Sequence, residues 1–297
     1  MARGDDSEAL HQLDTATLLR VLHRADGEAL AAAHAVTTGV GEVVDAVVDG
    51  WPRGGRLIYV GAGTSGRIGA LDAAECHPTF GVSEKRVIAV IAGGERALAH
   101  AVEAAEDSEP DGVAAVEELA VGADDVVVGL SASGSTPFTC AALEAAARRD
   151  ATTVAVTCAR AARLVAAASI AVILNVGGEI IDGSTRMKAG TAQKLVCNAI
   201  STASFIRLGR VWGRHMVAVS TTSDKLRRRA LAILQHLDAC ADEADAAALL
   251  ERAGGDLPTA LVMALATVER PAAAGLLARA HGDVHRALLL AREGEPA

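Results

Sequence analysis

Aromatic residues are scarce in this chain of 297 residues: two Trp, one Tyr and three Phe make up 2% of it. Because 51% of the residues are nonetheless hydrophobic, the core must consist mainly of Ala, Val, Leu and Ile, which favours closely packed helices. The formal net charge of −9 provides no basic field to displace counterions, so a nucleic-acid partner is not expected.

Disulfide patterns and long apolar runs are also missing. The five cysteines are irregularly spaced and include no CxxC pair, which is typical of reduced thiols and not of a disulfide framework or a zinc site. The amino-terminal stretch MARGDDSEAL is acidic and has no apolar segment typical of a secretory signal. Charged residues interrupt every apolar run before it is long enough to cross a bilayer. We therefore expect a cytoplasmic protein with no membrane partner.

Basic residues are dense at one place only, Arg227-Arg228-Arg229. The run lies in a stretch whose apolar residues recur at helical spacing, so we interpret it as a solvated helix face.

Short Val- and Ile-rich runs alternate with helical stretches in the middle of the chain. Nearly continuous hydrophobicity is typical of parallel strands that are buried on both faces. Alternation with helices implies right-handed crossovers, and so an α/β fold with a doubly wound, five-stranded parallel sheet. The predicted strands are Leu57–Val60, Val87–Ile91, Val126–Leu130, Thr153–Thr157 and Ile170–Leu174, and helices between them are predicted over Glu95–Asp107, Pro137–Arg149 and Arg160–Ala168.

Helices are predicted on both sides of this sheet. Thr15–Val48 forms one or two helices before it, and about Arg186–Leu208 forms a long helix after it. From Ser223 onward the pattern predicts a small helical bundle, in which Gly254-Gly255 ends one helix and Asp256 caps the next. We therefore expect an amino-terminal helical segment (1–50), an α/β domain (51–222) and a carboxy-terminal helical domain (223–297).

The stretch GAGTSG, residues 61–66, follows the first predicted strand and has the spacing of a dinucleotide-binding loop. A dinucleotide site also needs an acid at the end of the second strand for the ribose. Here that strand ends in IAGG, and the first acid beyond it is Glu95. Gly63, Thr64 and Ser65 instead place hydroxyls and free N–H groups at a helix start, which suits a phosphate monoester.

The third predicted strand is followed by a similar turn, SASGSTPF. Ser131, Ser133 and Thr136 supply three hydroxyls within six residues, and Thr136 and Pro137 are placed as the cap and first residue of a helix. Alone, this segment is also compatible with a generic Ser/Gly turn. Two hydroxyl-rich turns after neighbouring strands favour a phosphate site, and the absence of a Gly-Lys-Ser/Thr sequence argues against a nucleoside triphosphate.

These two turns resemble the SIS domain of phosphosugar-binding proteins. A longer similarity, to the N-acetylmuramic acid 6-phosphate etherase family, is carried by GAGTSGRIGALDAAECHPTFG, IAGGERALAHAVEAAEDS and GGEIIDGSTRMKAGTAQKLVCNAIST. The last segment is similar to a signature shared with glucokinase regulatory proteins. The resemblance extends from about Leu13 into the helical tail.

The resemblance implies a lyase that removes D-lactate from C3 of a phosphorylated amino sugar, by elimination followed by addition of water. It implies two catalytic acids, Glu75 in DAAECHPT and Glu106 in AVEAAEDS, and we assign Glu75 as the proton donor. No metal and no cofactor are implied. The expected partners are the small phosphosugar substrate and a second copy of the chain in a homodimer.

The segment GSTRMKAGTAQK offers further binding groups in Ser184, Arg186 and Lys188, whose cations suit the lactyl carboxylate or the phosphate. Helix capping by Ser184 or Thr185 is an equally good interpretation of the hydroxyls.

The sequence also departs from the family pattern, with His77 in place of Pro, Ser135 in place of a frequent Arg, and Asp182 in place of a small or hydroxyl residue. Two other functions stay open on the same fold: a phosphosugar-sensing regulator without catalysis, and an aldose–ketose isomerase.

Overall fold

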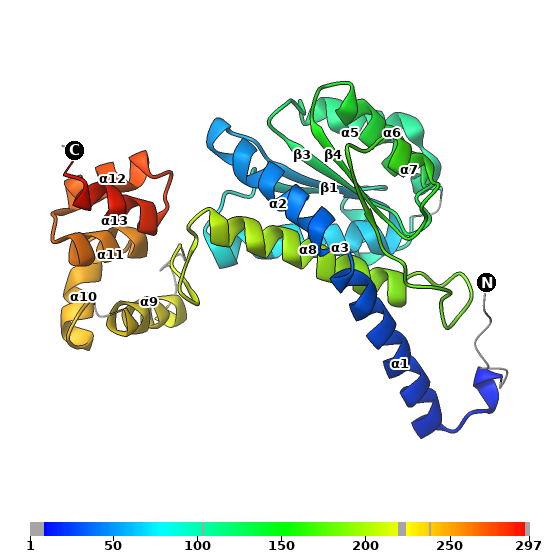
Figure 1. The fold of residues 1–297 in the computed structure, drawn as a ribbon, viewed down its shortest axis with the longest axis horizontal. Coiled ribbons are helices and arrows are strands. Elements are labelled where there is room, and N and C mark those ends of the chain that lie inside the picture. Colours follow the sequence, from blue (N-terminus) through cyan, green and yellow to red (C-terminus); the bar gives the residue numbers. More distant parts are fainter. Residues whose placement is uncertain (1–8, 103, 219–223, 238, 295–297) are drawn as a thin grey trace.

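The computed structural model describes residues 9–102, 104–218, 224–237 and 239–294. Figure 1 shows a sheet domain, a helix that projects from it, and a separate group of helices at the carboxy-terminal end. The elements before the third strand are η1 (Leu10–Gln12), α1 (Thr15–His34), α2 (Thr37–Gly50), η2 (Trp51–Arg53), β1 (Leu57–Gly61), α3 (Gly63–Phe80), β2 (Val87–Ile91), α4 (Arg96–Ala99), η3 (Ala105–Asp107) and α5 (Glu109–Glu118). The later ones are β3 (Val126–Leu130), α6 (Pro137–Ala147), β4 (Thr152–Thr157), α7 (Arg163–Ala166), β5 (Ile170–Ile173), α8 (Lys188–Arg207), β6 (Val211–Trp212), β7 (His215–Met216), α9 (Asp224–His236), α10 (Glu243–Arg252), α11 (Leu257–Ala266), α12 (Arg270–Arg279) and α13 (Val284–Arg292).

The predicted five-stranded parallel sheet is confirmed, with strand order β2-β1-β3-β4-β5. The strand order changes direction between β1 and β3. The strand that follows β1 in the chain, β2, lies on one side of this pair, and the strand that follows β3, β4, lies on the other side. Gly61 at the end of β1 lies opposite Leu130 at the end of β3. Loops that leave such a switch point form a crevice at the carboxyl edge of the sheet, where ligands bind in open α/β folds.

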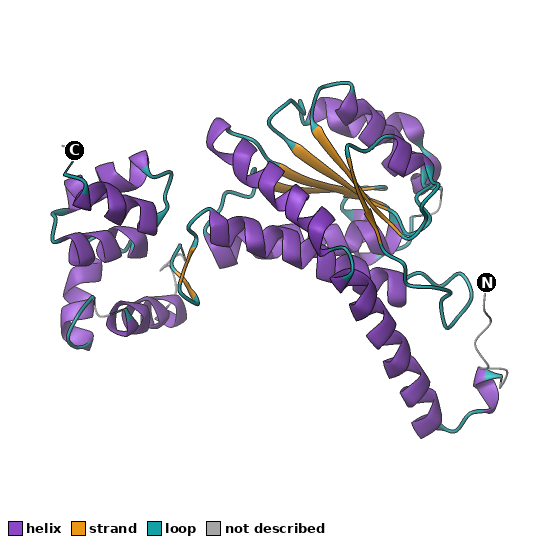
Figure 2. Ribbon diagram, viewed as in Figure 1, coloured by secondary structure: helices purple, strands orange, loops and turns teal. Residues whose placement is uncertain are grey.

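Helices cover both faces of the sheet (Figure 2). On one face α2, α3 and α8 bury Tyr59, Val128 and Phe205 with the strands, and α1 packs against α8. On the other face α5 and α6 bury Val127, Phe138 and their apolar neighbours. Small side chains dominate both layers, as the low aromatic content predicts.

Helix Glu95–Asp107 was predicted from the sequence, and this prediction is wrong. Only α4 and the single turn η3 are helical there, and Glu103 lies outside the described residues. Ala104 adopts a left-handed conformation with φ 60°, which a continuous helix cannot contain. The missed helix is α5, whose start was signalled by Ser108 as cap and by Pro110 in the first turn.

Two other predicted helix boundaries are corrected. The helix expected over Arg160–Ala168 is only the four residues of α7, and α8 begins at Lys188, not Arg186. Pro78 lies inside α3, and the helix continues to Phe80 and stops at Gly81 with φ 61°. A proline this close to the end removes a single backbone hydrogen bond, and glycine supplies the left-handed stop.

The carboxy-terminal helices α9–α13 have a hydrophobic core of their own. Asp256 caps α11 as predicted, accepting a hydrogen bond from the Thr259 N–H at 3.0 Å. The hairpin of β6 and β7 joins these helices to the end of α8, and Trp212 of the hairpin contacts His285 with ring centroids 5.8 Å apart. Ser223, the predicted start of the helical stretch, lies outside the described residues.

Within the described residues, no single helix has both the length and the apolarity to cross a membrane. Two bent pairs, Thr15–His34 with Thr37–Arg53 and Leu257–Ala266 with Arg270–Arg279, reach that threshold together by length and composition alone.

Candidate functional site

Two loops meet at the carboxyl edge of the sheet: the glycine loop (61–66) after β1 and the serine loop (131–136) after β3. Each depends on a glycine at a close approach. A Cβ on Gly66 would lie 2.6 Å from Ile91 Cγ1, and one on Gly134 would lie 2.5 Å from Ala162 Cβ. Since β1 and β3 pair directly, adjacent strands place the two loops within reach of one small ligand.

The glycine loop places the first turn of α3 at this edge. Ala62 stands in the cap position, and no described side chain caps the helix. The N–H groups of Gly63, Thr64 and Ser65 therefore point out of the helix start without the usual side-chain partner. Ser65 is committed elsewhere, because its Oγ donates to Gln193 Oε1 of α8 at 2.8 Å.

The serine loop is organised by its own hydroxyls. Ser131 is 3% exposed, and its Oγ accepts from the Gly134 N–H at 3.0 Å and contacts Thr136 Oγ1 at 2.8 Å. Ser133 is exposed, and its Oγ accepts from the Ser135 hydroxyl at 3.0 Å. Thr136 occupies the predicted cap position of α6, but its hydroxyl is bonded to Ser131 and caps no N–H in the described chain. Hydrogen bonds within the loop thus hold its hydroxyl groups close together.

Several helices away from this edge are capped by the side chain of the residue before their first turn. Asp14, Ser108, Asp242, Asp256 and Asp283 cap α1, α5, α10, α11 and α13. The starts of α3 and α6 have no such cap, as is also true of α2 and α12, but they alone of these four begin at the carboxyl edge of the sheet, where a positive dipole end suits an external anion.

Glu106 lies beside the glycine loop. The turn η3 places it on a cavity of about 240 Å³ that Gly63, Arg67 and Val102 also line. Arg67 of α3 fixes the opposite wall, because its guanidinium donates to the carbonyl oxygens of Leu98 and His100 at 3.1 and 2.9 Å. The exposed carboxyl of Glu106 therefore faces the space beside the helix start at which an anion would bind.

Glu75 is not brought to this cavity in the same chain. It is exposed on α3, twelve residues after Gly63, which places it about 18 Å farther along the helix axis. It shares an exposed stripe with Leu71, Ala74 and Pro78, at spacings of three and four residues. The two predicted catalytic acids thus lie at opposite ends of α3.

Of the two sequence interpretations of the hydroxyls in segment 183–188, helix capping is wrong. Among the described residues, neither Ser184 nor Thr185 caps α8. Glu179 does so, accepting from the N–H groups of Lys188 and Ala189 at 2.9 and 3.0 Å. Lys188 is 4% exposed, and its Nζ donates to Glu28 of α1 at 2.6 Å.

Arg186 is exposed and Ser184 half-buried, so these two stay accessible to a ligand. They adjoin the glycine loop, because a Cβ on Gly190 in the first turn of α8 would lie 3.4 Å from Thr64 Cγ2.

Gln193 and Glu179 are polar residues of this region that the sequence reasoning missed. Gln193 is 1% exposed, and its Nε2 has no hydrogen-bond partner in the described part of the chain. Its one sequence signal is a polar side chain four residues after Ala189, on the buried face of a predicted helix. Glu179 carries no such signal, since it precedes the helix by nine residues.

The three departures from the family pattern lie in different surroundings. His77 lies in the last turn of α3, and its Nδ1 is 2.6 Å from the carbonyl oxygen of Val82, which follows the helix. Ser135 belongs to the hydroxyl set of the serine loop, and Asp182 is exposed in the loop before α8. Only Ser135 therefore adjoins the candidate phosphate position.

A buried carboxyl connects α3 to the sheet and to α8. Asp72 is 7% exposed, and it accepts from the Tyr59 hydroxyl at 2.8 Å and from Ser201 Oγ at 3.1 Å. Burial raises the pKa of Asp72, and the two hydroxyls oppose that rise by stabilising its charged form. Among the described residues, no group of three His, Cys, Asp or Glu side chains is placed to hold a metal ion.

Comparison with known proteins gives consistent matches. Residues 39–147 match the family model described as glucokinase regulatory protein N-terminal SIS domain, and residues 96–203 match the SIS domain model. An N-acetylmuramic acid 6-phosphate etherase of Cutibacterium acnes is 45% identical over 89% of this chain and 86% of its own length. One of Rubrobacter xylanophilus is 45% identical over 89% of this chain and 87% of its own. Among solved structures, a phosphoheptose isomerase from Francisella tularensis has a TM-score of 0.48 and 16% identity, over 64% of this chain and all of that one.

Proposed function

This chain belongs to the N-acetylmuramic acid 6-phosphate etherase family, and we propose that it cleaves the lactyl ether of N-acetylmuramic acid 6-phosphate. The products are N-acetylglucosamine 6-phosphate and D-lactate, which makes the protein a carbon–oxygen lyase of amino-sugar catabolism. One observation supports the binding of a phosphorylated sugar. The glycine loop and the serine loop lie side by side at the switch point of the sheet, and each leads into a helix whose N-cap side chain forms no capping hydrogen bond. A phosphorylated substrate agrees with the expected cytoplasmic location.

The reaction needs one base and one acid. In the open-chain sugar the C1 aldehyde acidifies the C2 proton, which a base removes while the C3–O bond to lactate breaks. The leaving oxygen takes a proton from the acid, and water then adds across the C2–C3 double bond. Each positioned proton transfer contributes roughly 10²–10⁴-fold.

We assign Glu106 as the base, because it lies on the cavity beside the glycine loop. Ser131, Ser133 and the starts of α3 and α6 hold the phosphate, with Thr64 and Thr136 beside them. Arg186 is the cation for the lactyl carboxylate, since Lys188 is already paired with Glu28. Ser65 and Ser184 complete the proposed binding set.

We assign Glu75 as the acid, supplied by a second copy of the chain. One protomer holds its own Glu75 about 18 Å along α3 from the glycine loop, so a single chain does not join both acids in one site. In a symmetric dimer the same face is used on both copies, and two equivalent composite sites follow.

The layer of α1, α3 and α8 offers a surface for this contact. Leu30, Leu71 and Ile206 are 45%, 53% and 49% exposed on these three helices, of which α1 and α3 each pack on α8. An apolar groove of about 240 Å³ lies between α1, α2 and α8, with Leu195 and Val40 in its walls. Exposed apolar side chains around a groove are typical of protein–protein contacts.

The function is tested by incubating the protein with N-acetylmuramic acid 6-phosphate in D2O. Release of D-lactate, with one deuterium at C2 of the sugar product, is the expected result because the C2 proton exchanges during elimination. Binding without lactate release would indicate a sensor, and an isomerised sugar with its ether intact would indicate an isomerase; either result contradicts the proposal.

A further inference from the structure

A second pocket lies between the β6–β7 hairpin and α9, with a volume of about 380 Å³. Its polar lining consists of Arg214 and His215 from the hairpin and of Arg229 and His236 from α9. Met216, Ala232 and Ile233 form its apolar part. None of the described residues that line it is acidic, although the chain carries a net charge of −9. Basic side chains are thus concentrated in one pocket of a chain that is acidic as a whole.

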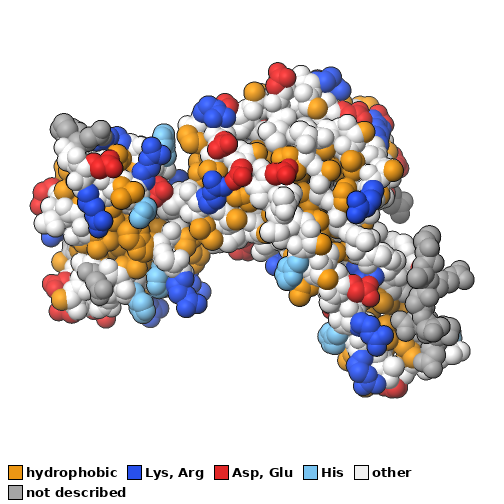
Figure 3. Space-filling view, viewed as in Figure 1, with side chains coloured by type: hydrophobic (Ala, Val, Ile, Leu, Met, Phe, Trp, Pro, Cys, Tyr) orange, Lys and Arg blue, Asp and Glu red, His pale blue; other side chains and the backbone are white. Residues whose placement is uncertain are grey.

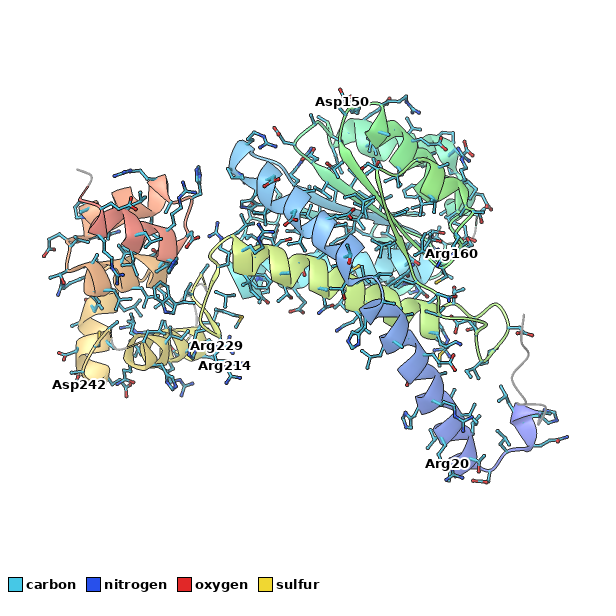
Figure 4. All side chains as sticks on the ribbon, in the orientation of Figure 1. Arg20, Asp150, Arg160, Arg214, Arg229 and Asp242 are labelled. Atoms are coloured by element: carbon cyan, nitrogen blue, oxygen red, sulfur yellow. The ribbon has the colours of Figure 1, made fainter. Side chains whose placement is uncertain are left out.

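The cations converge because two elements face each other. Arg229 and His236 lie seven residues apart, and helical periodicity puts them on one face of α9 with Ile233. The rings of His215 and His236 approach with centroids 5.2 Å apart, which fixes the hairpin against the helix. Figure 4 shows Arg214 and Arg229 together at this end of α9, away from Asp242. Lys, Arg and His side chains gather on the same edge in Figure 3.

Both guanidinium groups are exposed, and no acid among the described residues pairs with them. Neither Arg214 nor Arg229 forms an ion pair with an acid in the described part of the chain. Other exposed arginines have such partners: Arg53 pairs with Asp124, and Arg163 pairs with Glu109 and Glu144. Two arginines without counter-charge raise the local positive potential and attract anions.

We propose that this pocket binds a small phosphate monoester. A phosphate group carries about −1.5 to −2 charges at neutral pH, which two permanently charged guanidinium groups neutralise. Arginine also presents paired N–H donors that match phosphate oxygens, and each imidazole adds a donor. The apolar part then contacts the organic portion of the ligand.

The pocket is separate from the phosphate position of the same chain. The glycine loop contacts the first turn of α8, whereas the hairpin follows its last residue. Since α8 has 20 residues, the two places are about 30 Å apart. The proposal therefore concerns a second ligand and does not depend on the lyase reaction.

The methionines provide a site-specific measurement. Of the four in the chain, Met216 lines the pocket, Met187 precedes α8 at the opposite end, Met263 lies in the core of the carboxy-terminal helices, and Met1 is outside the described residues. In the full chain labelled with methyl-13C methionine, titration with inorganic phosphate should shift the Met216 methyl signal saturably and leave Met263 in place. N-acetylglucosamine 6-phosphate should act similarly, and D-lactate, with one negative charge, more weakly.

Arg214→Gln with Arg229→Gln should raise the Kd read from Met216 about tenfold or more, since two charged contacts are lost. The control is Arg227→Gln, which removes one positive charge from the opposite side of α9 and should change Kd less than about twofold. The proposal is overturned if Met216 does not respond, if Met263 moves in parallel with it, or if the double variant binds as tightly as the control.

Discussion

Ser65 donates its hydroxyl proton to Gln193 at 2.8 Å, so the glycine loop is fastened to α8 by the group that the sequence assigns to the phosphate. A serine hydroxyl has a single proton to donate. While that bond persists, Ser65 offers a ligand its N–H and lone pairs only. Gln193, whose buried Nε2 has no partner among the described residues, thereby determines whether the Ser65 hydroxyl can donate to a ligand.

Ser65→Ala alone should raise the Kd for N-acetylglucosamine 6-phosphate less than about twofold, because no donor to the ligand is lost. In Gln193→Met the Ser65 proton is released, and adding Ser65→Ala should then cost about 1 kcal/mol of binding. Calorimetric titration of the four proteins measures this coupling. Ser133→Ala is the comparison, with an expected loss of about 1–2 kcal/mol from removal of an exposed hydroxyl that can turn to a ligand. Equal losses for Ser65→Ala in both backgrounds would contradict the assignment.

Mixed dimers test the composite site directly. Glu75→Gln and Glu106→Gln should each abolish most lactate release in uniform dimers. A dimer of one Glu75→Gln and one Glu106→Gln subunit should recover about half of wild-type activity, because one of its two sites keeps both acids.

The control for this experiment places both substitutions in one subunit beside a wild-type partner. Each site then lacks one acid, and lactate release should stay as low as in the uniform variants. If both acids came from one chain, this dimer would be half active and the first would be inactive.

Asp125 should contribute to stability above its ordinary titration range. It is 5% exposed and pairs with Arg56, whose Nε and NH2 donate at 2.9 and 2.5 Å. Burial raises the pKa of Asp125, but the hydrogen bonds from Arg56 and Gly122 prevail and lower it overall. Asp125→Asn should therefore cost about 3 kcal/mol at pH 7, and less as the pH falls below 3.8 through the folded-state pKa.

Urea unfolding of wild type and variant, at pH 7 and below pH 3.8, measures this cost. The control is Asp124→Asn, which removes a more exposed pair with Arg53 and should cost less than about 1 kcal/mol. Comparable losses for the two variants would show that burial is not the deciding factor.

Asp72 should have the opposite pH dependence. Because burial raises its pKa, the folded chain binds this proton more tightly than the unfolded chain does. Stability should fall as the pH rises from 3.8 through the raised value, and then stay constant. Asp72→Asn keeps the shape and lacks this titration, so its stability relative to wild type should improve between pH 4 and pH 7. A constant difference across that range would mean that Asp72 does not titrate there.

The sheet was predictable because each strand is one short apolar run, and the central strands β1, β3 and β4 are buried on both faces. Local signals also placed the serine loop and the cap at Asp256. Ala104 was not predictable, since nothing in an alanine announces a left-handed conformation, and with it the helix over Glu95–Asp107 was misplaced. Glu179 was missed because it caps α8 from across a loop. The separation of Glu75 from Glu106 follows only from where their helices begin, which depends on packing and not on local sequence.

In the proposed dimer, α3 begins in one catalytic centre and carries the acid of the other. Tyr59 and Ser201 bind the middle of α3 through Asp72, so we expect the helix to move as a rigid unit when either end is displaced. A phosphosugar that draws the first turn of α3 toward itself then displaces the acid in the opposite centre. The two centres are therefore expected to communicate, with substrate saturation curves whose Hill coefficient departs from one and returns to one in dimers that keep a single competent centre.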